Sequence, residues 1–494
     1  AAPSDATEFK DVERVKMRVN VDARVGGYHL TGVYLPAGET LTVNVSSEIA
    51  QAGYRLRLNS FVYDRTNSTL IDSTEKKITS EKGGIVELWV PASATSDNSF
   101  DVIIEGGIVM PYYRMGRDTT EHIYVGDGKY SILDGENIRF YVPSDLLFDS
   151  QGECRVEDLY NTLLWWQSAV TFLNKATDMV SLKSNYSVRV AIGDYSQTPQ
   201  INATTGAIEI NTSYFENVLD FENLKVGKSW DLLYKICELK VGLSSGFEGV
   251  FAVDMIVDIL TNIDCVMMTY SGYESTNSWL NNAYSCLEKT IELLSVPESE
   301  RDENHSQNVM RAFFINILHS FGVDKTLDIL IEYSHASKES ENGEMTIDEF
   351  ALSMSKILQR DMTFYFEMFR RGLTEDMELS QSTVDKMKGK QVYIPVQSKY
   401  AVGGNNEFYD LGYTVPMGES TAFDFQNSII SFVDGWNVYK VESDTTRWTQ
   451  EDGIFYYNPI TSKLVDDYTI YLKNGEYSAV LYGRLNVNIS TAVY

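Results

Sequence analysis

The chain contains little cysteine, histidine or proline, with four, five and ten of these residues among its 494. The cysteines are too few for a disulfide scaffold and form no Cys-x-x-Cys pair, which argues against a zinc ribbon. We expect Cys237 and Cys265 to be buried as small hydrophobic side chains, because both lie in apolar segments. No two histidines have the spacing of a metal-binding pair. No run of eighteen apolar residues occurs, so no membrane-spanning helix is expected.

Positive charge is also scarce, with 41 Lys and Arg against 70 Asp and Glu and a formal net charge of −29. This balance argues against nucleic acid or an anionic membrane as a partner, because neutralising phosphates requires clustered basic residues. An acidic surface suits a soluble extracellular protein. The first residues, AAPSDATEF, lack both a methionine and an apolar segment, as in a mature chain after removal of a signal peptide. We therefore expect a secreted, extracellular or cell-surface-associated protein.

The pattern of apolar residues predicts a multidomain α+β protein. Short alternating segments separated by Gly, Pro and Asn predict an N-terminal β-sandwich over residues 1–115, followed by a connector over 116–150. Apolar residues at helical spacing predict a mainly helical domain over 151–388, with short strands at SVRVAIG and GAIEIN. Strand patterns return over 389–494 and predict a C-terminal β-sandwich, with hairpin turns at Asp434-Gly435 and Asn474-Gly475.

Polar residues interrupt the most apolar part of the helical domain, between Trp230 and Tyr270. Its first helix places Leu233, Ile236 and Cys237 on one face, and its second helix is apolar almost all round. Asp254, Asp258 and Asn262 nevertheless form a stripe at i, i+4 and i+8 of that second helix. An ionised group buried without a partner costs several kcal/mol, roughly, so these acids need a cation, a metal or hydrogen-bond donors. The nearest candidates in sequence are Tyr234 and Lys235, beside a further acid, Glu238.

The order of these features resembles one family of enzymes. A tryptophan, a five-residue helical box, a Gly/Ser loop and a buried helix with an acid are similar to the core of the enhancin-like, mucin-degrading zinc metallopeptidases, which are of the gluzincin type. Further landmarks in the same order are Thr31 to Val45 (TGVYLPAGETLTVNV), Gly106 to Tyr113 (GGIVMPYY), and Asp348, Glu349, Phe350 with Phe366, Glu367, Phe369. The resemblance covers roughly Thr31 to Met387.

The residues that carry zinc chemistry in that family differ in this chain. The family's His-Glu-x-x-His box and third glutamate ligand correspond to Tyr234, Lys235, Glu238 and Asp254. A lysine in place of the general base holds no lone pair for a water proton at neutral pH, and its charge repels a metal. The resemblance therefore implies a degenerate member of the family with no catalytic residues, no zinc cofactor and Asp258 and Asn262 as further polar residues of the cleft.

Three functions follow as hypotheses. The first is an inactive homologue that binds a glycan or glycoprotein, or that assembles with itself into a coat, matrix or filament. The second is an active secreted metallopeptidase that cleaves mucin-like glycoproteins through a non-standard metal site made of Glu238, Asp254 and a histidine such as His319. The third is a serine hydrolase with Ser244 as the nucleophile, because residues 242–246 read Gly-Leu-Ser-Ser-Gly. The expected helix before Ser244 disfavours the third, since a nucleophile elbow follows a strand.

Overall fold

The computed structural model describes residues 8–393 and, beyond them, the strands of the C-terminal part. Within 8–393 the undescribed residues are 65–66, 94–97, 119–125, 179–186, 245, 248, 270–276, 282, 295, 340–343, 371–376 and 391–392. The chain forms two compact units. The first comprises residues 1–244 and 267–275, and the second comprises 245–266 and 276–494. None of the described helices has the length and hydropathy of a membrane-spanning segment.

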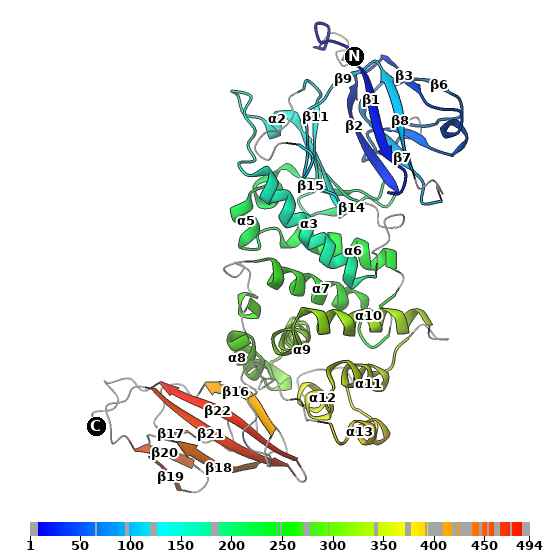
Figure 1. The fold of residues 1–494 in the computed structure, drawn as a ribbon. Helices are drawn as coiled ribbons and strands as arrows, with labels where there is room; N and C mark the ends of the chain where they lie inside the picture. Colours follow the sequence, from blue (N-terminus) through cyan, green and yellow to red (C-terminus); the bar gives the residue numbers. More distant parts are fainter. Residues whose placement is uncertain are drawn as a thin grey trace. The chain divides into compact units, whose positions relative to one another are not determined.

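The N-terminal part of the first unit consists of two antiparallel sheets (Figure 1). One sheet has the order β1-β8-β3-β6, and its strands are β1 (Lys16–Asp22), β8 (Ser99–Glu105), β3 (Thr40–Asn44) and β6 (Glu75–Thr79). The other has the order β5-β4-β7-β2-β9, and its strands are β5 (Ser68–Leu70), β4 (Arg55–Leu58), β7 (Gly84–Val90), β2 (Gly27–Leu35) and β9 (Ile108–Val109). The predicted β-rich N-terminal region is confirmed.

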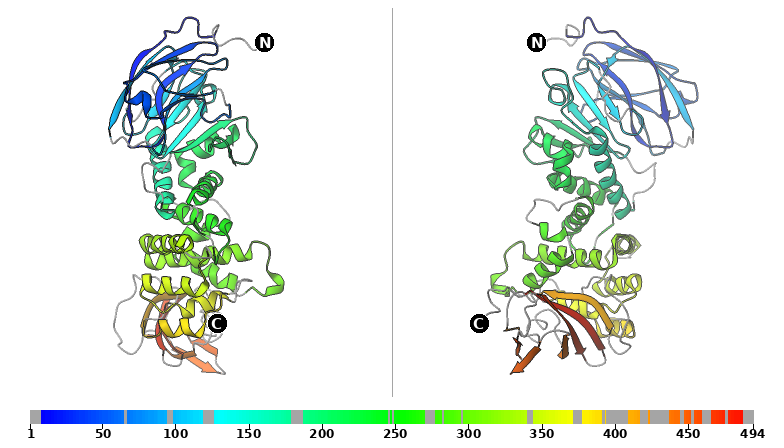
Figure 2. Two further views of the ribbon diagram at one scale, coloured as in Figure 1. Left: turned by 90° about the vertical axis from the view of Figure 1, so that its right-hand side faces the viewer. Right: turned by 60° about the vertical axis from the view of Figure 1, so that its left-hand side comes forward.

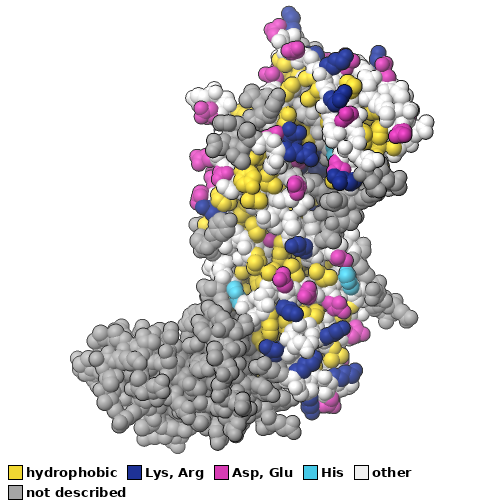
Figure 3. Space-filling view, in the orientation of Figure 1, with side chains coloured by type: hydrophobic (Ala, Val, Ile, Leu, Met, Phe, Trp, Pro, Cys, Tyr) yellow, Lys and Arg dark blue, Asp and Glu magenta, His cyan; other side chains and the backbone are white. Residues whose placement is uncertain are grey.

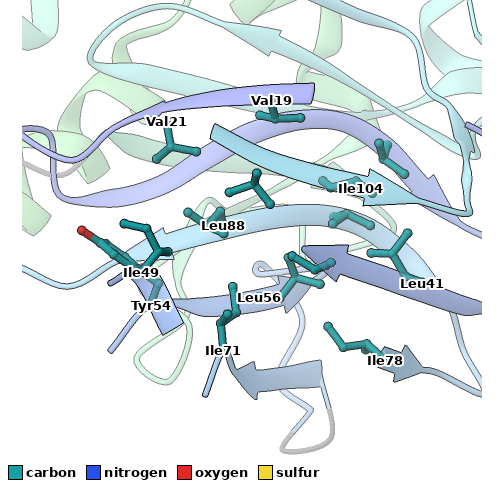
Figure 4. Close-up of a cluster of buried hydrophobic side chains, with 14 of the residues drawn as sticks. Val19, Val21, Leu41, Ile49, Tyr54, Leu56, Ile71, Ile78, Leu88 and Ile104 are labelled. Carbon is teal, nitrogen blue, oxygen red and sulfur yellow. The ribbon is translucent and has the colours of Figure 1, made fainter. Parts of the chain in front are cut away.

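Alternation of apolar and polar residues explains the core between these sheets. In β1 the side chains of Val19 and Val21 are buried while their polar neighbours are partly or fully exposed, and Figure 4 shows both pointing into a cluster with Leu56, Leu88 and Ile104. Each fully buried aliphatic side chain of this kind contributes roughly 1.5–3 kcal/mol. The alternation therefore decides which face of each strand is buried.

A six-stranded mixed sheet follows, with the order β10-β11-β12-β13-β15-β14. Its strands are β10 (Tyr112–Arg114), β11 (Tyr130–Asp134), β12 (Ile138–Pro143), β13 (Val188–Gly193), β15 (Ile208–Asn211) and β14 (Gln200–Ile201). β13 and β15 are the two short strands that were predicted. The parallel pair β12 and β13 joins strands from both sides of residue 150, where a domain boundary was predicted. The predicted four-part division of the chain stays a prediction.

A buried polar network connects this mixed sheet to the N-terminal sandwich, and both views of Figure 2 show the two side by side. Glu87 of β7 is fully buried and accepts hydrogen bonds from Tyr141 (2.8 Å), Ser60 (2.6 Å) and Arg139. Arg139 also donates to Asp134 (2.8 Å) and to the carbonyl of Tyr28 (2.8 Å). Every member is hydrogen-bonded, which is the condition under which a buried polar network favours one arrangement.

The helices of the first unit contact the mixed sheet and one another. They are α2 (Ser144–Leu147), α3 (Leu159–Ala176), α4 (Phe215–Leu219), α5 (Phe221–Lys225) and α6 (Trp230–Ser244). α3 begins at its N-cap Asp158, whose side chain accepts the N–H of Asn161. Trp166 of α3 is fully buried, and its indole nitrogen donates to the carbonyl of Val218 (2.7 Å). These contacts hold α3 against α4, and α3 also packs against α6, the helix that carries the candidate site.

The second unit is helical up to residue 387. Its helices are α7 (Val253–Met268, with its last two residues in the first unit), α8 (Ala283–Leu294), α9 (His305–Phe321), α10 (Val323–Glu339), α11 (Ile347–Leu358), α12 (Thr363–Arg370) and α13 (Gln381–Met387). The helical central region was predicted correctly. Residues 313–335 and 346–369 each have helical spacing throughout, yet each segment is broken, at Gly322 (φ +87°) and at Gln359 (φ +54°), because both residues adopt left-handed backbone conformations. The core of these helices is aromatic, with Phe313 and Phe350 against Phe366.

Strands follow in the C-terminal part, where the backbone pairing is described. One sheet has the order β16-β22-β21-β18 and the other β17-β20-β19. The strands are β16 (Tyr409–Pro416), β17 (Ala422–Phe423), β18 (Asn437–Ser443), β19 (Arg447–Glu451), β20 (Ile454–Asn458), β21 (Val465–Asn474) and β22 (Tyr477–Asn486). β21 and β22 pair antiparallel, and their last pair is Asn474 with Tyr477. Asn474, which was predicted to lie in the turn, is therefore the last residue of β21. The other predicted turn, at Asp434-Gly435, lies outside the described residues.

Candidate functional site

Helix α6 carries the box that corresponds to the zinc-binding motif. Its predicted apolar face is correct, since Leu233, Ile236 and Cys237 are all fully buried. The helix continues to Ser244, so Gly242 and Ser244 are helical and do not belong to the expected Gly/Ser loop. Val241 is buried in this last turn, and the Ser244 hydroxyl donates to the Val241 carbonyl (3.1 Å). A helix therefore precedes Ser244, as predicted, which is the wrong context for a nucleophile elbow.

The box itself is held together by side-chain contacts within α6. The ring of Tyr234 stacks on that of Trp230, with centroids 5.1 Å apart and planes at 28°. The Lys235 Nζ lies 2.8 Å from the Glu238 Oε2, an i, i+3 ion pair whose side chains are 23% and 43% exposed. The residue in the position of the general base is thus a cation, paired with the residue in the position of the second ligand. Lys235 therefore neutralises Glu238, the acid nearest to it in the sequence.

Helix α7 carries the polar stripe, and its three residues differ in their surroundings. Asp254 is exposed in the first turn, and its Oδ1 accepts the N–H of Met255 (3.0 Å). Asp258 and Asn262 are both almost fully buried. The Asn262 amide donates to the Asp258 carbonyl (2.8 Å) and, at 3.3 Å, to its carboxylate. Of the three residues of the stripe, only Asp258 and Asn262 therefore belong to a buried network.

The counter-charge of Asp258 comes from α9. Arg311 donates from Nε and Nη2 to the two oxygens of Asp258 at 2.7 and 2.6 Å, and from Nη1 to Asn308 Oδ1 at 2.9 Å. This corrects the expectation that Tyr234 or Lys235 would supply the partner of a buried acid on this helix. Arg311 lies 53 residues further along the chain, and the planar guanidinium matches the carboxylate with two parallel bonds. A cation was one of the three partners predicted for a buried acid here, beside a metal and hydrogen-bond donors, but its source was not predicted.

A zinc ion does not fit the residues that this chain places at the family's ligand positions. Lys235 brings a positive charge into the box and is paired with Glu238 at a ligand position. The buried carboxylate of Asp258, which is not at a ligand position, has both oxygens bonded to Arg311. Among the described residues, no three His, Cys, Asp or Glu side chains form a group that could hold a metal ion. His319, the proposed imported ligand, places Nε2 2.9 Å from the Leu280 carbonyl, and burial lowers the pKa of this imidazole. Tyr234, Lys235 and Glu238 belong to the first unit and Asp254 to the second.

Sequence reasoning missed two buried ionisable residues on these helices. Asp264 of α7 is fully buried, its carboxyl oxygens have no hydrogen-bond partner among the described residues, and burial raises its pKa well above the ordinary value. Lys240 of α6 is 1% exposed, and burial lowers its pKa to about 8. The sequence signal for both was a charged residue within an otherwise apolar helix, and the same signal was present for Arg311.

Residues 10–105 match the family model described as the N-terminal domain of M60-like peptidases. The predicted resemblance to this family is confirmed by the match of this N-terminal domain. A comparison with curated proteins found no relative.

Three solved structures show the same fold. A functionally unknown conserved protein of Bacillus anthracis str. Ames (mutant form) is 13% identical, with a TM-score of 0.54 over 96% of this chain and 100% of that one. The ZmpB metallopeptidase of Clostridium perfringens is 12% identical, with a TM-score of 0.52 and coverages of 96% and 100%. The catalytic module of the metalloprotease ZmpA of Clostridium perfringens is 13% identical, with a TM-score of 0.51 and coverages of 95% and 98%. At these identities the likeness concerns the fold alone.

Proposed function

We propose that this protein is a catalytically inactive M60-like metallopeptidase homologue that binds an extracellular glycoprotein or glycan. The observation that carries the proposal is the ion pair between Lys235 and Glu238, at 2.8 Å. A general base must accept a proton from water, and the ammonium group of a lysine has no lone pair with which to do so. The second ligand position is occupied by the same pair. Loss of base and ligand together leaves the fold without hydrolytic chemistry.

The bound partner follows from what related proteins do and from the surface of this one. ZmpB and ZmpA are a metallopeptidase and a metalloprotease, and the fold that recognises a protein substrate is retained here without the zinc ligands. The net charge of −29 favours extracellular, soluble partners over nucleic acid. The proposal includes secretion or display at the cell surface, and a C-terminal β-sandwich over residues 389–494. Self-assembly into a structural layer is the alternative function of the same binding surface.

The deciding experiment measures metal content and cleavage on the same preparation. Protein purified without chelators or metal-affinity resin is analysed for zinc and calcium, then incubated with a mucin-like glycoprotein, and the products are read by mass spectrometry. We expect near-zero metal, no cleavage, and co-sedimentation with the intact glycoprotein. Light scattering at increasing concentration separates binding of a partner from self-assembly.

Two variants sharpen the result. Glu238→Gln breaks the ion pair without adding a zinc ligand, so we expect it to remain inactive. Ser244→Ala tests the serine hydrolase directly. About one zinc ion per chain with chelator-sensitive cleavage would overturn the proposal in favour of a non-standard metallopeptidase that uses Glu238, Asp254 and His319. Chelator-resistant cleavage lost in Ser244→Ala would establish the hydrolase instead.

A further inference from the structure

The N-terminal sandwich presents aromatic and arginine side chains on its sheet face opposite the core. In the β2, β7 and β4 ladder, Trp89 lies directly between Tyr28 and Arg55. Directly opposed residues of antiparallel strands point to the same face. Leu56 and Leu88, the next residues along these strands, point to the core. Tyr28, Trp89 and Arg55 are all partly exposed, so this row forms a surface and not a filled core.

Two further arginines lie over the ring of Tyr28. The guanidinium carbon of Arg189 is 4.1 Å from the ring centroid and that of Arg57 is 5.8 Å away. Arg189, on β13, is 6% exposed, and its hydrogen bonds go to neutral acceptors, the Ser60 carbonyl (2.9 Å), the Ser60 hydroxyl (3.0 Å) and the Thr205 carbonyl. The Nε of Arg57 is buried and has no hydrogen-bond partner among the described residues.

The charges of this region leave a positive excess. The nearby acids Glu87 and Asp134 both accept hydrogen bonds from Arg139. Across the described part of the chain, neither Arg57 nor Arg189 has a carboxylate within ion-pair distance. A guanidinium removed from water needs an anion to offset its desolvation. In a chain with a net charge of −29, whose described surface mixes basic and acidic side chains (Figure 3), this excess is local.

We propose that Tyr28, Trp89 and Arg57 form a binding site for an acidic saccharide, a sugar ring that carries a carboxylate, with the buried charge of Arg189 over the ring of Tyr28. Arg57 is partly exposed and offers a planar guanidinium that matches a carboxylate with paired hydrogen bonds. Arg189 is buried and donates to Ser60 and Thr205, so it contributes its positive charge and not hydrogen bonds to the ligand. Trp89 supplies a flat, partly exposed ring beside the two arginines, against which the apolar face of a sugar packs. An acidic peptide would pair with Arg57 equally well. It lacks the flat apolar face with which a sugar ring packs on Trp89, so the observations favour the sugar.

The site deepens the glycan-binding function proposed above and names its ligand class, yet it uses no residue of α6 or α7. It rests on that function only in assuming that glycans are the partners. Loss of peptidase activity and acidic-saccharide binding are measured separately, so either proposal can fail while the other stands.

The test is isothermal titration of the full chain with a short glucuronic acid oligosaccharide and with its neutral glucose counterpart. We expect binding of the acidic oligosaccharide and at least about tenfold weaker binding of the neutral one, because a charged hydrogen-bonded pair is lost. Arg57→Gln should weaken the acidic ligand by about tenfold or more and leave the neutral one unchanged. Trp89→Ala should weaken both. The matched control is Lys77→Gln, which removes one exposed positive charge from β6 in the other sheet and should change neither.

Thermal unfolding of each variant confirms that it is folded. The proposal is overturned if the acidic oligosaccharide does not bind, or if Lys77→Gln weakens it as much as Arg57→Gln does. It is also overturned if inorganic phosphate or an acidic peptide competes fully at equal concentration, since the site would then recognise charge alone. Arg57→Lys provides a second arm, in which charge is kept and paired donation is lost, and a clear loss of affinity is expected.

Discussion

Asp258 illustrates how one buried residue can look like a metal ligand in sequence and be something else in the fold. It lies one turn after Asp254, the residue that the resemblance places at a zinc-ligand position, and it is 1% exposed. Both of its oxygens are bonded to Arg311. The carboxylate therefore has its full complement of charge and donors without a metal. Its role is to join α7 to α9 within the second unit.

Removal of Arg311 should lower the free energy of unfolding by more than the loss of its own hydrogen bonds would. In Arg311→Met the carboxylate of Asp258 stays buried without a counter-charge, and we expect a loss of about 3–5 kcal/mol in the free energy of unfolding by urea titration. The double variant Asp258→Leu with Arg311→Met should recover most of this loss, because no charge is then left unpaired. Equal destabilisation in the single and double variants would contradict the pairing.

Asp264 predicts a pH dependence. Burial raises its pKa well above the ordinary value, so the folded protein keeps a proton that the unfolded chain releases near pH 4, roughly. The folded state then binds more protons, and the free energy of unfolding falls as pH rises above that value. Asp264→Asn removes the titration. Urea unfolding should show the variant gaining stability relative to the wild type between pH 5 and pH 8, and a difference that is flat with pH would rule this out.

At the scale of helices and strands, local patterns predicted element type well and element ends poorly. The apolar face of α6 and the strands β13 and β15 follow from periodicity, because each is decided by neighbouring residues. The segment from Phe100 to Met110 reads as one strand, yet Gly106 and Gly107 adopt positive φ and divide it into β8 and β9, which belong to different sheets. The partner of Asp258 was beyond prediction for a different reason, since pairing over 53 residues depends on the packing of α7 against α9.

Helix α11 shows a start signal that can be tested. Thr346 accepts the N–H of Glu349 through its hydroxyl (3.2 Å), and Glu349 accepts the N–H of Thr346 (3.0 Å), which is a complete capping box. Thr346→Ala leaves a backbone donor without its partner and should cost about 1 kcal/mol in urea unfolding. Glu349→Gln is the matched control, because glutamine also completes the box, and it should cost clearly less. A cost as large as that of Thr346→Ala would show that charge, and not capping, dominates.

For the molecule as a whole, the fold is shared with proteins that have few side chains in common with this chain. TM-scores of 0.51 to 0.54 at 12–13% identity show that the architecture tolerates replacement of most side chains. Buried apolar patterns can be kept by many sequences, since hydrophobic residues of similar volume substitute for one another. A zinc site has no such freedom, because ligand identity and geometry are both fixed. We therefore propose that Tyr234, Lys235, Glu238 and Asp254 at these positions remove the zinc chemistry while the fold is kept.

Stability without metal is the corresponding prediction for the whole chain. A ligand that binds only the folded state raises the melting temperature by mass action, and its removal lowers it. Because Lys235 and Glu238 neutralise each other and Asp258 is bonded to Arg311, we expect thermal unfolding to be the same in excess chelator and in added zinc. The Lys235→Glu variant is the control: it restores a carboxylate at the base position without the histidine ligands, and its melting temperature should also be independent of zinc. A fall in melting temperature of the wild type with chelator would show that a metal supports the fold through residues other than these.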